Sequence, residues 1–180
     1  LADLILQQPV VGNLEDLALP FVNPDLGVET VEDALAGAQD IVAETIAEDA
    51  ELRRQMRTVF SREATVRCRL ADGDKDPSSK YADYYDFASP IGQMLPHRVL
   101  ALNRAEKEGV LRIEVDLPEE SALSIIGHFY TPNPQSSLAR SLRLALEDGY
   151  ARLLAPAMER EMRSELTERA ERHAINVFTA

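Results

Sequence analysis

The sequence predicts a mainly α-helical protein with a small antiparallel, hairpin-like β-sheet and a long C-terminal helix. Apolar residues recur at helical spacing over most of the chain. Two short segments instead alternate apolar and polar residues and contain β-branched side chains, which is typical of strands. The chain has 180 residues and 45% hydrophobic content, which is enough for one compact domain or for two small subdomains that share a core.

The sequence divides into three consecutive parts. They are an acidic N-terminal helical part (1–63), a small α/β part with two paired strands (64–117) and a C-terminal helical part that ends in a long helix (118–180). Three prolines and a glycine interrupt residues 1–26, so we expect short helices and turns there. A longer helix is predicted after Thr30, because Thr30 and Asp33 have the spacing of a capping box. The polar pair Glu48 and Asp49 is predicted to begin another helix.

Strand-like alternation occurs in residues 64–71 and again in residues 110–117. We expect these two segments to pair antiparallel, because a lone strand would leave its backbone groups without partners. Between them, Ser89 and Pro90 have the pattern of an N-cap followed by a proline at the first helical position. A helix is predicted from His97 to Glu108, with Gly109 ending it.

The C-terminal part is predicted to be almost entirely helical. A helix over Glu119–Tyr130 precedes a proline-rich loop, and a long helical run begins near Ser136. Pro156 lacks an amide hydrogen and should kink or restart this helix. Three acid–arginine pairs at i,i+4 spacing follow it, namely Glu159–Arg163, Glu165–Arg169 and Glu168–Arg172.

No spacing in the sequence indicates a catalytic, cofactor or metal site. The three histidines, His97, His128 and His173, are far apart, and the sequence contains no phosphate-binding glycine loop or nucleophile elbow. The single cysteine, Cys68, excludes a zinc finger and an internal disulfide, and it is compatible with the reducing cytoplasm. The one alternative is a catalytic dyad of Cys68 and a histidine that folding brings together. We expect no enzymatic activity and no cofactor.

The net charge of −12 is placed very unevenly. Residues 1–50 contain eleven Asp or Glu and no Lys or Arg, whereas the other 130 residues contain 20 acidic and 19 basic side chains. An acidic surface repels phosphate backbones, so the first third should not contact nucleic acid. It could face a basic partner, or it could be a solvated surface that maintains solubility. No apolar run is long enough to cross a membrane, so no membrane partner is expected.

The strongest basic window lies in residues 51–70, where six arginines outnumber two glutamates. Arg53, Arg54 and Arg57 are the candidate nucleic-acid contacts, because they would lie together on one helix. The alternative is that they pair with the acidic first third. A cluster of aromatic residues could likewise stack on bases or anchor a loop to the core, and it consists of Tyr81, Tyr84, Tyr85 and Phe87.

Several long motifs resemble the Tex family of bacterial transcription-accessory proteins. They are Phe21–Glu44, Lys80–Phe87, His97–Arg98, Glu106–Leu111, Leu153–Glu161 and Leu166–Arg169. The motifs occur in order along essentially the whole chain. The resemblance implies the late N-terminal and central helical region of a multidomain factor. It also implies that a ribonuclease-H-like domain, helix-hairpin-helix modules and an S1 domain lie elsewhere in that factor.

This resemblance gives the expected function. The chain would be a helical scaffold in a cytoplasmic transcription accessory factor that binds RNA or DNA through domains outside these residues, with the transcription machinery as a possible partner. The chain alone would be monomeric and would bind nucleic acid weakly. It lacks an initiator Met and a stop signal for its last helix, so we expect an internal region of a longer protein. The alternative is a stand-alone acidic module that binds other proteins.

Overall fold

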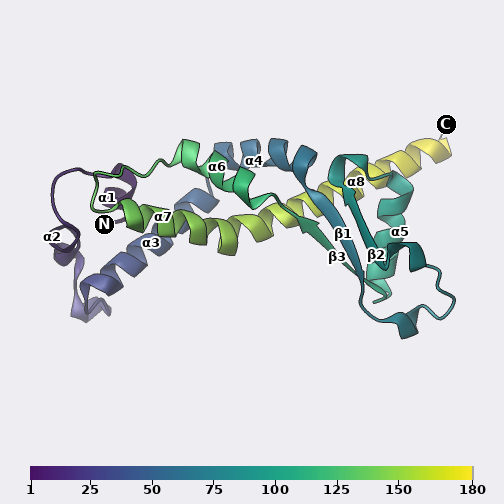
Figure 1. Ribbon diagram of the computed structural model, residues 1–180, viewed down its shortest axis with the longest axis horizontal. Helices are drawn as coiled ribbons and strands as arrows, with labels where there is room; N and C mark the ends of the chain where they lie inside the picture. Colours follow the sequence, from purple (N-terminus) through teal and green to yellow (C-terminus); the bar gives the residue numbers. More distant parts are fainter. Residues whose placement is uncertain (180) are drawn as a thin grey trace. The chain divides into compact units, whose positions relative to one another are not determined.

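The computed structural model describes residues 1–179, which form two compact units. Unit 1 comprises Leu1–Met56 and Glu119–Pro156, and unit 2 comprises Arg57–Pro118 together with the residues from Ala157 onward. Each unit is therefore built from two separate stretches of chain, which cut across the three consecutive parts drawn from the sequence. The mainly helical class, the small antiparallel sheet and the long C-terminal helix are confirmed (Figure 1).

Unit 1 consists of helices and their connecting loops and contains none of the strands of the sheet. Its helices are α1 (Ala2–Gln7), α2 (Leu14–Ala18), α3 (Val31–Ala47), the start of α4 (Ala50–Glu63), α6 (Glu119–Phe129) and α7 (Ala139–Asp148). The capping box of α3 is confirmed, because Asp33 N donates to Thr30 Oγ1 and Thr30 N donates to Asp33 Oδ2. The helix predicted near Asp49 is also confirmed, because Leu52 N donates to Asp49 Oδ1 and so caps α4. Tyr130 Oη donates to the other oxygen of Asp49 at 2.6 Å, which ties the end of α6 to this cap.

Helix α3 packs against α1 and α7 through small and branched side chains. The backbones approach closely at Gly149, the residue that ends α7, where a Cβ would lie 3.1 Å from both Cα and the carbonyl oxygen of Ala43. The lack of a side chain at Gly149 thus sets how closely the two helices pack. On α3 itself, the buried face includes Leu35, Val42 and Ile46.

The disturbance predicted at Pro156 takes the form of a π turn. Residues Gly149–Leu154 form this wider turn between α7 and α8 (Ala155–Thr179), and the helical run is unbroken from Ala139 to Thr179. Pro156 has no amide hydrogen to donate to the preceding turn, and a π turn relieves the clash by shifting the local hydrogen bonding. None of the helices in residues 1–179 is long and apolar enough to cross a membrane.

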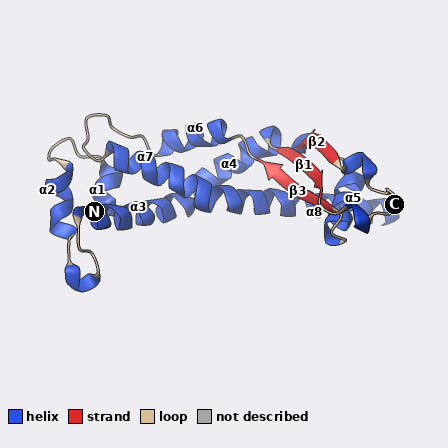
Figure 2. Ribbon diagram, turned by 60° about the horizontal axis from the view of Figure 1, so that its bottom comes forward, coloured by secondary structure: helices blue, strands red, loops and turns tan. Residues whose placement is uncertain are grey.

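Unit 2 contains a three-stranded antiparallel sheet in the order β2–β1–β3 (Figure 2). The strands are β1 (Thr65–Leu70), β2 (Asp86–Pro90) and β3 (Leu111–Asp116). The predicted pairing of residues 64–71 with 110–117 is confirmed, since Val66 lies opposite Val115 and Cys68 opposite Ile113.

The prediction that Ser89 and Pro90 begin a helix is wrong, because both residues belong to strand β2. Ser89 lies opposite Val66 of β1, and this pairing supplies the second edge of β1 with hydrogen-bond partners. Pro90 is the last residue of the edge strand, a position where its missing amide costs no ladder hydrogen bond. The next helix, α5 (Pro96–Lys107), begins at Pro96 instead, and Gly109 follows it with φ +78° as predicted for a helix end.

The ion pair predicted between Glu159 and Arg163 of α8 does not form, because each side chain binds another partner. Glu159 Oε1 accepts a hydrogen bond from the amide of Val115 at 3.1 Å, and Arg163 pairs with Glu106 of α5 at 2.8 Å. The reason is that β3 is an edge strand, so its outward amides need acceptors from another element. Both side chains therefore bind across to other elements rather than to each other.

A matched pair of glycine substitutions tests the packing of α7 on α3. We expect Gly149→Ala to destabilise the protein by about 1–3 kcal/mol, because a methyl group there meets helix backbone that cannot move aside. Gly37→Ala, in the same pair of packed helices, has nothing within 4 Å of the added Cβ and should stabilise by about 0.5–1 kcal/mol. Urea unfolding measures both. Equal effects of the two substitutions would contradict the packing described.

Candidate nucleic-acid interface

The three candidate arginines all lie on helix α4, and each is engaged within the fold. Arg53 Nε donates to the carbonyl oxygen of Ala47 at 2.6 Å. Arg54 Nε donates to Glu51 Oε2 at 2.9 Å, and Arg57 Nη1 donates to Glu161 Oε2 at 3.0 Å. Arg53 and Arg57 are half-buried, whereas Arg54 is exposed. A phosphate at this position would therefore have to compete with existing hydrogen bonds.

The alternative, that these arginines pair with the acidic first fifty residues, describes only part of the arrangement. Arg53 binds a backbone carbonyl of that segment, but the carboxylates of Glu51 and Glu161 lie outside it. Ion pairs between partly exposed side chains add little stability, so they do not by themselves prevent exchange for a phosphate. Nucleic-acid contact by Arg53, Arg54 and Arg57 therefore stays a prediction. A phosphate bound there would have to replace their present hydrogen bonds.

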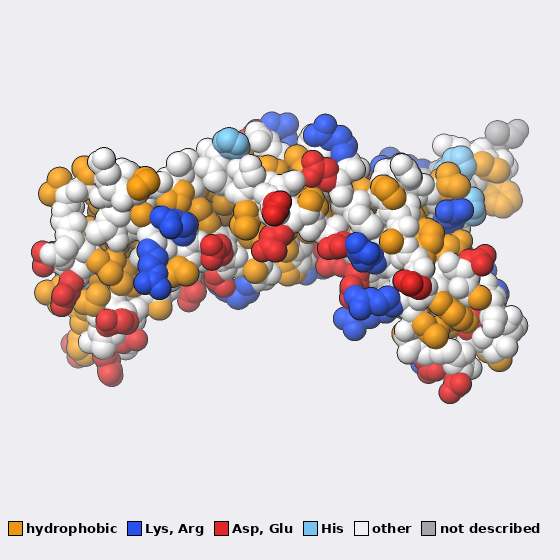
Figure 3. Space-filling view, viewed as in Figure 1, with side chains coloured by type: hydrophobic (Ala, Val, Ile, Leu, Met, Phe, Trp, Pro, Cys, Tyr) orange, Lys and Arg blue, Asp and Glu red, His pale blue; other side chains and the backbone are white. Residues whose placement is uncertain are grey.

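The charge around this helix differs sharply between the two units. Unit 1 contains sixteen Asp or Glu and five Arg, a net charge of −11, whereas unit 2 contains fifteen acidic and fourteen basic side chains, a net charge of −1. Figure 3 shows acidic side chains over α2 and the start of α3. Because affinity for a polyanion depends on neutralising phosphates, unit 1 is poorly suited to nucleic acid.

The aromatic cluster belongs to a loop that Asp76 organises. Asp76 is only 5% exposed, and its oxygens accept hydrogen bonds from the amides of Lys80 and Tyr81 and from the hydroxyl of Tyr85. Burial raises the pKa of Asp76, but these hydrogen bonds outweigh it and hold the pKa below its ordinary value. This role of Asp76 could not be predicted, because an acidic residue in a polar loop has the same pattern as a solvated one.

The aromatic side chains themselves serve the fold. Tyr81 is 4% exposed, and the Lys80 ammonium lies 4.7 Å from the centre of its ring. Tyr84 and Phe87 make an edge-to-face contact with centroids 5.3 Å apart, and the Arg98 guanidinium lies 5.9 Å from the Phe87 ring. Core anchoring is thus confirmed for Tyr81, and the Phe87 ring already has the Arg98 guanidinium over it, where a stacked base would lie.

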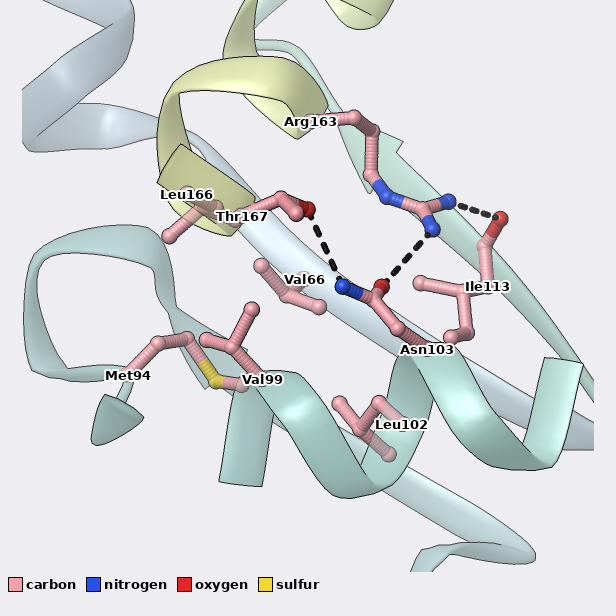
Figure 4. Close-up of a pocket in the computed structure, with 9 residues that line it drawn as sticks. All are labelled: Val66, Met94, Val99, Leu102, Asn103, Ile113, Arg163, Leu166 and Thr167. Atoms are coloured by element: carbon pink, nitrogen blue, oxygen red, sulfur yellow. Dashed lines mark hydrogen bonds between the residues drawn. The ribbon is translucent and has the colours of Figure 1, made fainter. Parts of the chain in front are cut away.

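A polar clamp joins α8 to α5 and the sheet in unit 2 (Figure 4). Arg163 donates to Asn103 Oδ1 at 3.3 Å and to the carbonyl oxygen of Ile113 at 3.5 Å, in addition to its pair with Glu106. Asn103 Nδ2 in turn donates to Thr167 Oγ1 at 3.0 Å. The hollow beside this clamp has room for little more than one water molecule, so it is no ligand site.

Sequence reasoning missed this clamp, although a signal for it existed. Asn103 and Glu106 are three residues apart on one helix, and Arg163 and Thr167 are four apart on another, so each pair shares a helix face. Two polar pairs of this kind on otherwise amphipathic helices are typical of a hydrogen-bonded contact between the helices.

The reactive side chains are not assembled into a site. Cys68 is 1% exposed on β1, and burial raises the pKa of its thiol to about 11, so it is protonated at neutral pH and a poor nucleophile. His97, His128 and His173 are all exposed. Within residues 1–179, no three His, Cys, Asp or Glu side chains are grouped as metal ligands would be.

Replacing Asp76 tests the role of its hydrogen bonds. We expect Asp76→Asn to lower the thermal midpoint at neutral pH, because the loop loses a charged acceptor. A lowered folded-state pKa stabilises the fold above the unfolded value of about 3.9 and loses that effect as the pH falls through the folded-state value. The difference in thermal midpoint between the wild type and Asp76→Asn should therefore become smaller as the pH falls. Asp83→Asn, on the exposed side of the same loop, is the control, and equal midpoints for all three proteins at neutral pH would refute this role.

Comparison with known proteins places the chain in one family. Residues 12–178 match a family model described as Tex central region-like. The chain is 34% identical to the uncharacterised protein YdcI of Bacillus subtilis over 99% of this chain and 25% of that protein. It is 30% identical to the transcriptional accessory protein Tex of Neisseria gonorrhoeae over 99% of this chain and 24% of the relative.

A eukaryotic relative is similar over much of the same region. The S1 RNA-binding domain-containing protein 1 of Pongo abelii is 30% identical over 89% of this chain and 17% of its own length. The chain thus spans about a quarter or less of the length of the curated relatives it matches. A match that covers nearly every element of both units shows that the chain belongs to the Tex central region-like family.

Proposed function

We propose that the chain is a helical scaffold region of a Tex-type transcription accessory factor whose nucleic-acid contacts are made by domains outside these residues. The main support is the distribution of charge. Unit 1 has a net charge of −11, and the arginines of α4 bind acceptors within the fold. A relative is named a transcriptional accessory protein and another is named for an S1 RNA-binding domain, which fits nucleic acid and the transcription machinery as partners of the whole protein.

The same proposal covers what the chain does not do. We propose that it has no catalytic turnover and uses no cofactor, that it functions in the cytoplasm and that it is monomeric in isolation. The protonated state of the Cys68 thiol and the exposure of all three histidines support the absence of a nucleophilic dyad. Its contribution to the factor would be geometric, through helices α4 and α8, which supply residues to both units.

The binding of nucleic acid by the isolated chain tests this proposal. We expect a dissociation constant no tighter than about 10⁻⁴ M for single-stranded RNA and for duplex DNA at physiological salt. The reason is that any phosphate bound at Arg53 and Arg57 displaces their present partners and faces the field of unit 1. Fluorescence anisotropy with labelled oligonucleotides over a salt series measures the affinity.

Variants separate a true site from weak attraction. Arg53→Glu with Arg57→Glu should leave the weak binding unchanged within error, and Arg104→Glu with Arg112→Glu in unit 2 serves as the charge-matched control. Micromolar binding at about 0.15 M salt that is abolished only by the α4 pair would show a recognition module and would refute the scaffold proposal.

A further inference from the structure

The segment from Val10 to Thr30 displays apolar side chains instead of burying them. Between these residues only Ala18 is buried. Six large apolar side chains are exposed there, at 37–80%, and they are Val10, Val11, Leu14, Leu19, Phe21 and Leu26. Exposed apolar side chains are ordinary one at a time, but a group on one segment is typical of an interaction site.

This segment has a defined shape although it adds little to the core. Asn13 caps α2, and Asn23 caps the 3-10 turn Pro24–Leu26. Asn23 and Val28 exchange backbone hydrogen bonds at 2.8 and 3.1 Å, and Gly27 completes the turn with φ +79°, which favours glycine. The turn therefore holds Leu26, 78% exposed, at its tip. Because the turn is already ordered, binding at Leu26 would cost little further backbone entropy.

A hollow lies between the start of α2 and the start of α3. Leu14 and Val31 contribute its apolar surface, and Asn13, Glu15 and Glu32 contribute its polar surface. All five residues belong to unit 1. We call the exposed residues of this hollow and of the turn, from Leu14 to Glu32, the acidic apolar surface. Figure 3 shows its orange and red side chains interspersed over α2 and the loop that follows.

The charges on this surface indicate the chemistry of what binds it. Glu15, Asp25, Glu29 and Glu32 form no ion pair within residues 1–179, and the first fifty residues contain no Lys or Arg that could neutralise them. An occupant that buries the apolar side chains must also bring positive charge to these carboxylates, because a buried carboxylate without a partner is costly.

We propose that the acidic apolar surface is a docking site for a basic amphipathic segment of a partner protein. Apolar side chains of that segment would contact Leu14, Phe21 and Leu26, and its Lys or Arg side chains would pair with the flanking carboxylates. Nucleic acid does not fit, because its phosphates would be repelled. A second copy of the chain fits poorly, because the same surface offers acid against acid across a two-fold axis.

A designed peptide tests the docking site directly. The probe is a synthetic helix of Leu and Lys at amphipathic spacing, added to the isotope-labelled 180-residue chain at about 0.15 M salt. We expect amide chemical-shift changes confined to residues 10–32. The matched peptide with Glu in place of Lys, and the one with Ser in place of Leu, should produce none.

Substitutions separate this site from general attraction to an acidic protein. Phe21→Ser with Leu26→Ser should weaken peptide binding about tenfold or more, as expected for apolar residues at the centre of an interface. Ile41→Ser is the control, because Ile41 is 55% exposed on α3 and has Asp40 and Glu44 as its acidic neighbours. It should change the affinity less than about twofold. Thermal unfolding checks that both variants remain folded.

Four results would overturn the proposal. The first is no binding of the Leu–Lys peptide, and the second is shift changes spread equally over α3 and α7. The third is that RNA or duplex DNA shifts the same residues. The fourth is self-association of the wild-type chain in sedimentation that Leu26→Ser abolishes, which would assign the surface to a second copy.

Discussion

The helical run from Ala139 to Thr179 must bury one apolar face along most of its length, and the rest of the structure follows from this constraint. In unit 1 the face includes Leu142, Leu146 and Leu154, and in unit 2 it continues with Met158, Met162, Leu166 and Ala170. Burying such side chains is the main favourable contribution to folding. The chain on either side of α4 supplies the partners, which is why each unit combines an early and a late stretch.

A glycine and a π turn adapt this helical run to its surroundings. Gly149 allows the π turn to approach α3 at Ala43, and the π turn accommodates Pro156 without breaking the helix. In unit 2 the fit is polar as well as apolar, since Arg163 satisfies the carbonyl oxygen of Ile113 together with two side chains of α5. A half-buried arginine with several partners specifies the register of α8 on the sheet better than apolar contacts alone.

Local signals in the sequence predicted most of the helices and the central strand pair, and the errors arose where distant partners decide the structure. The capping box at Thr30 and the alternation in residues 110–117 depend on neighbouring residues only, so they could be read directly. Strand β2 could not, because Ser89 and Pro90 also fit a helix start and only the free edge of β1 distinguishes the two. The partner of Arg163 was missed for the same reason, since Glu159 is its neighbour in sequence but Glu106 is its partner in space.

The candidate site shows the same limit. The residues Arg53, Arg54 and Arg57 were identified from their charge and their spacing on a helix. Neither reveals that Ala47, Glu51 and Glu161 already accept their hydrogen bonds. The exposed state of Leu26 likewise depends on a turn whose hydrogen bonds link Asn23 to Val28. These features are the observations that support the two proposals, weak binding of nucleic acid and a docking site on the acidic apolar surface.

Cross-linking in a full-length member of the family can show whether this region positions nucleic-acid-binding domains without binding nucleic acid itself. RNA carrying photoreactive bases would be cross-linked to that protein, and the attached peptides identified by mass spectrometry. We expect cross-links outside the region that corresponds to these 180 residues. Cross-links concentrated on the helix that corresponds to α4, at the positions of Arg53 and Arg57, would contradict it.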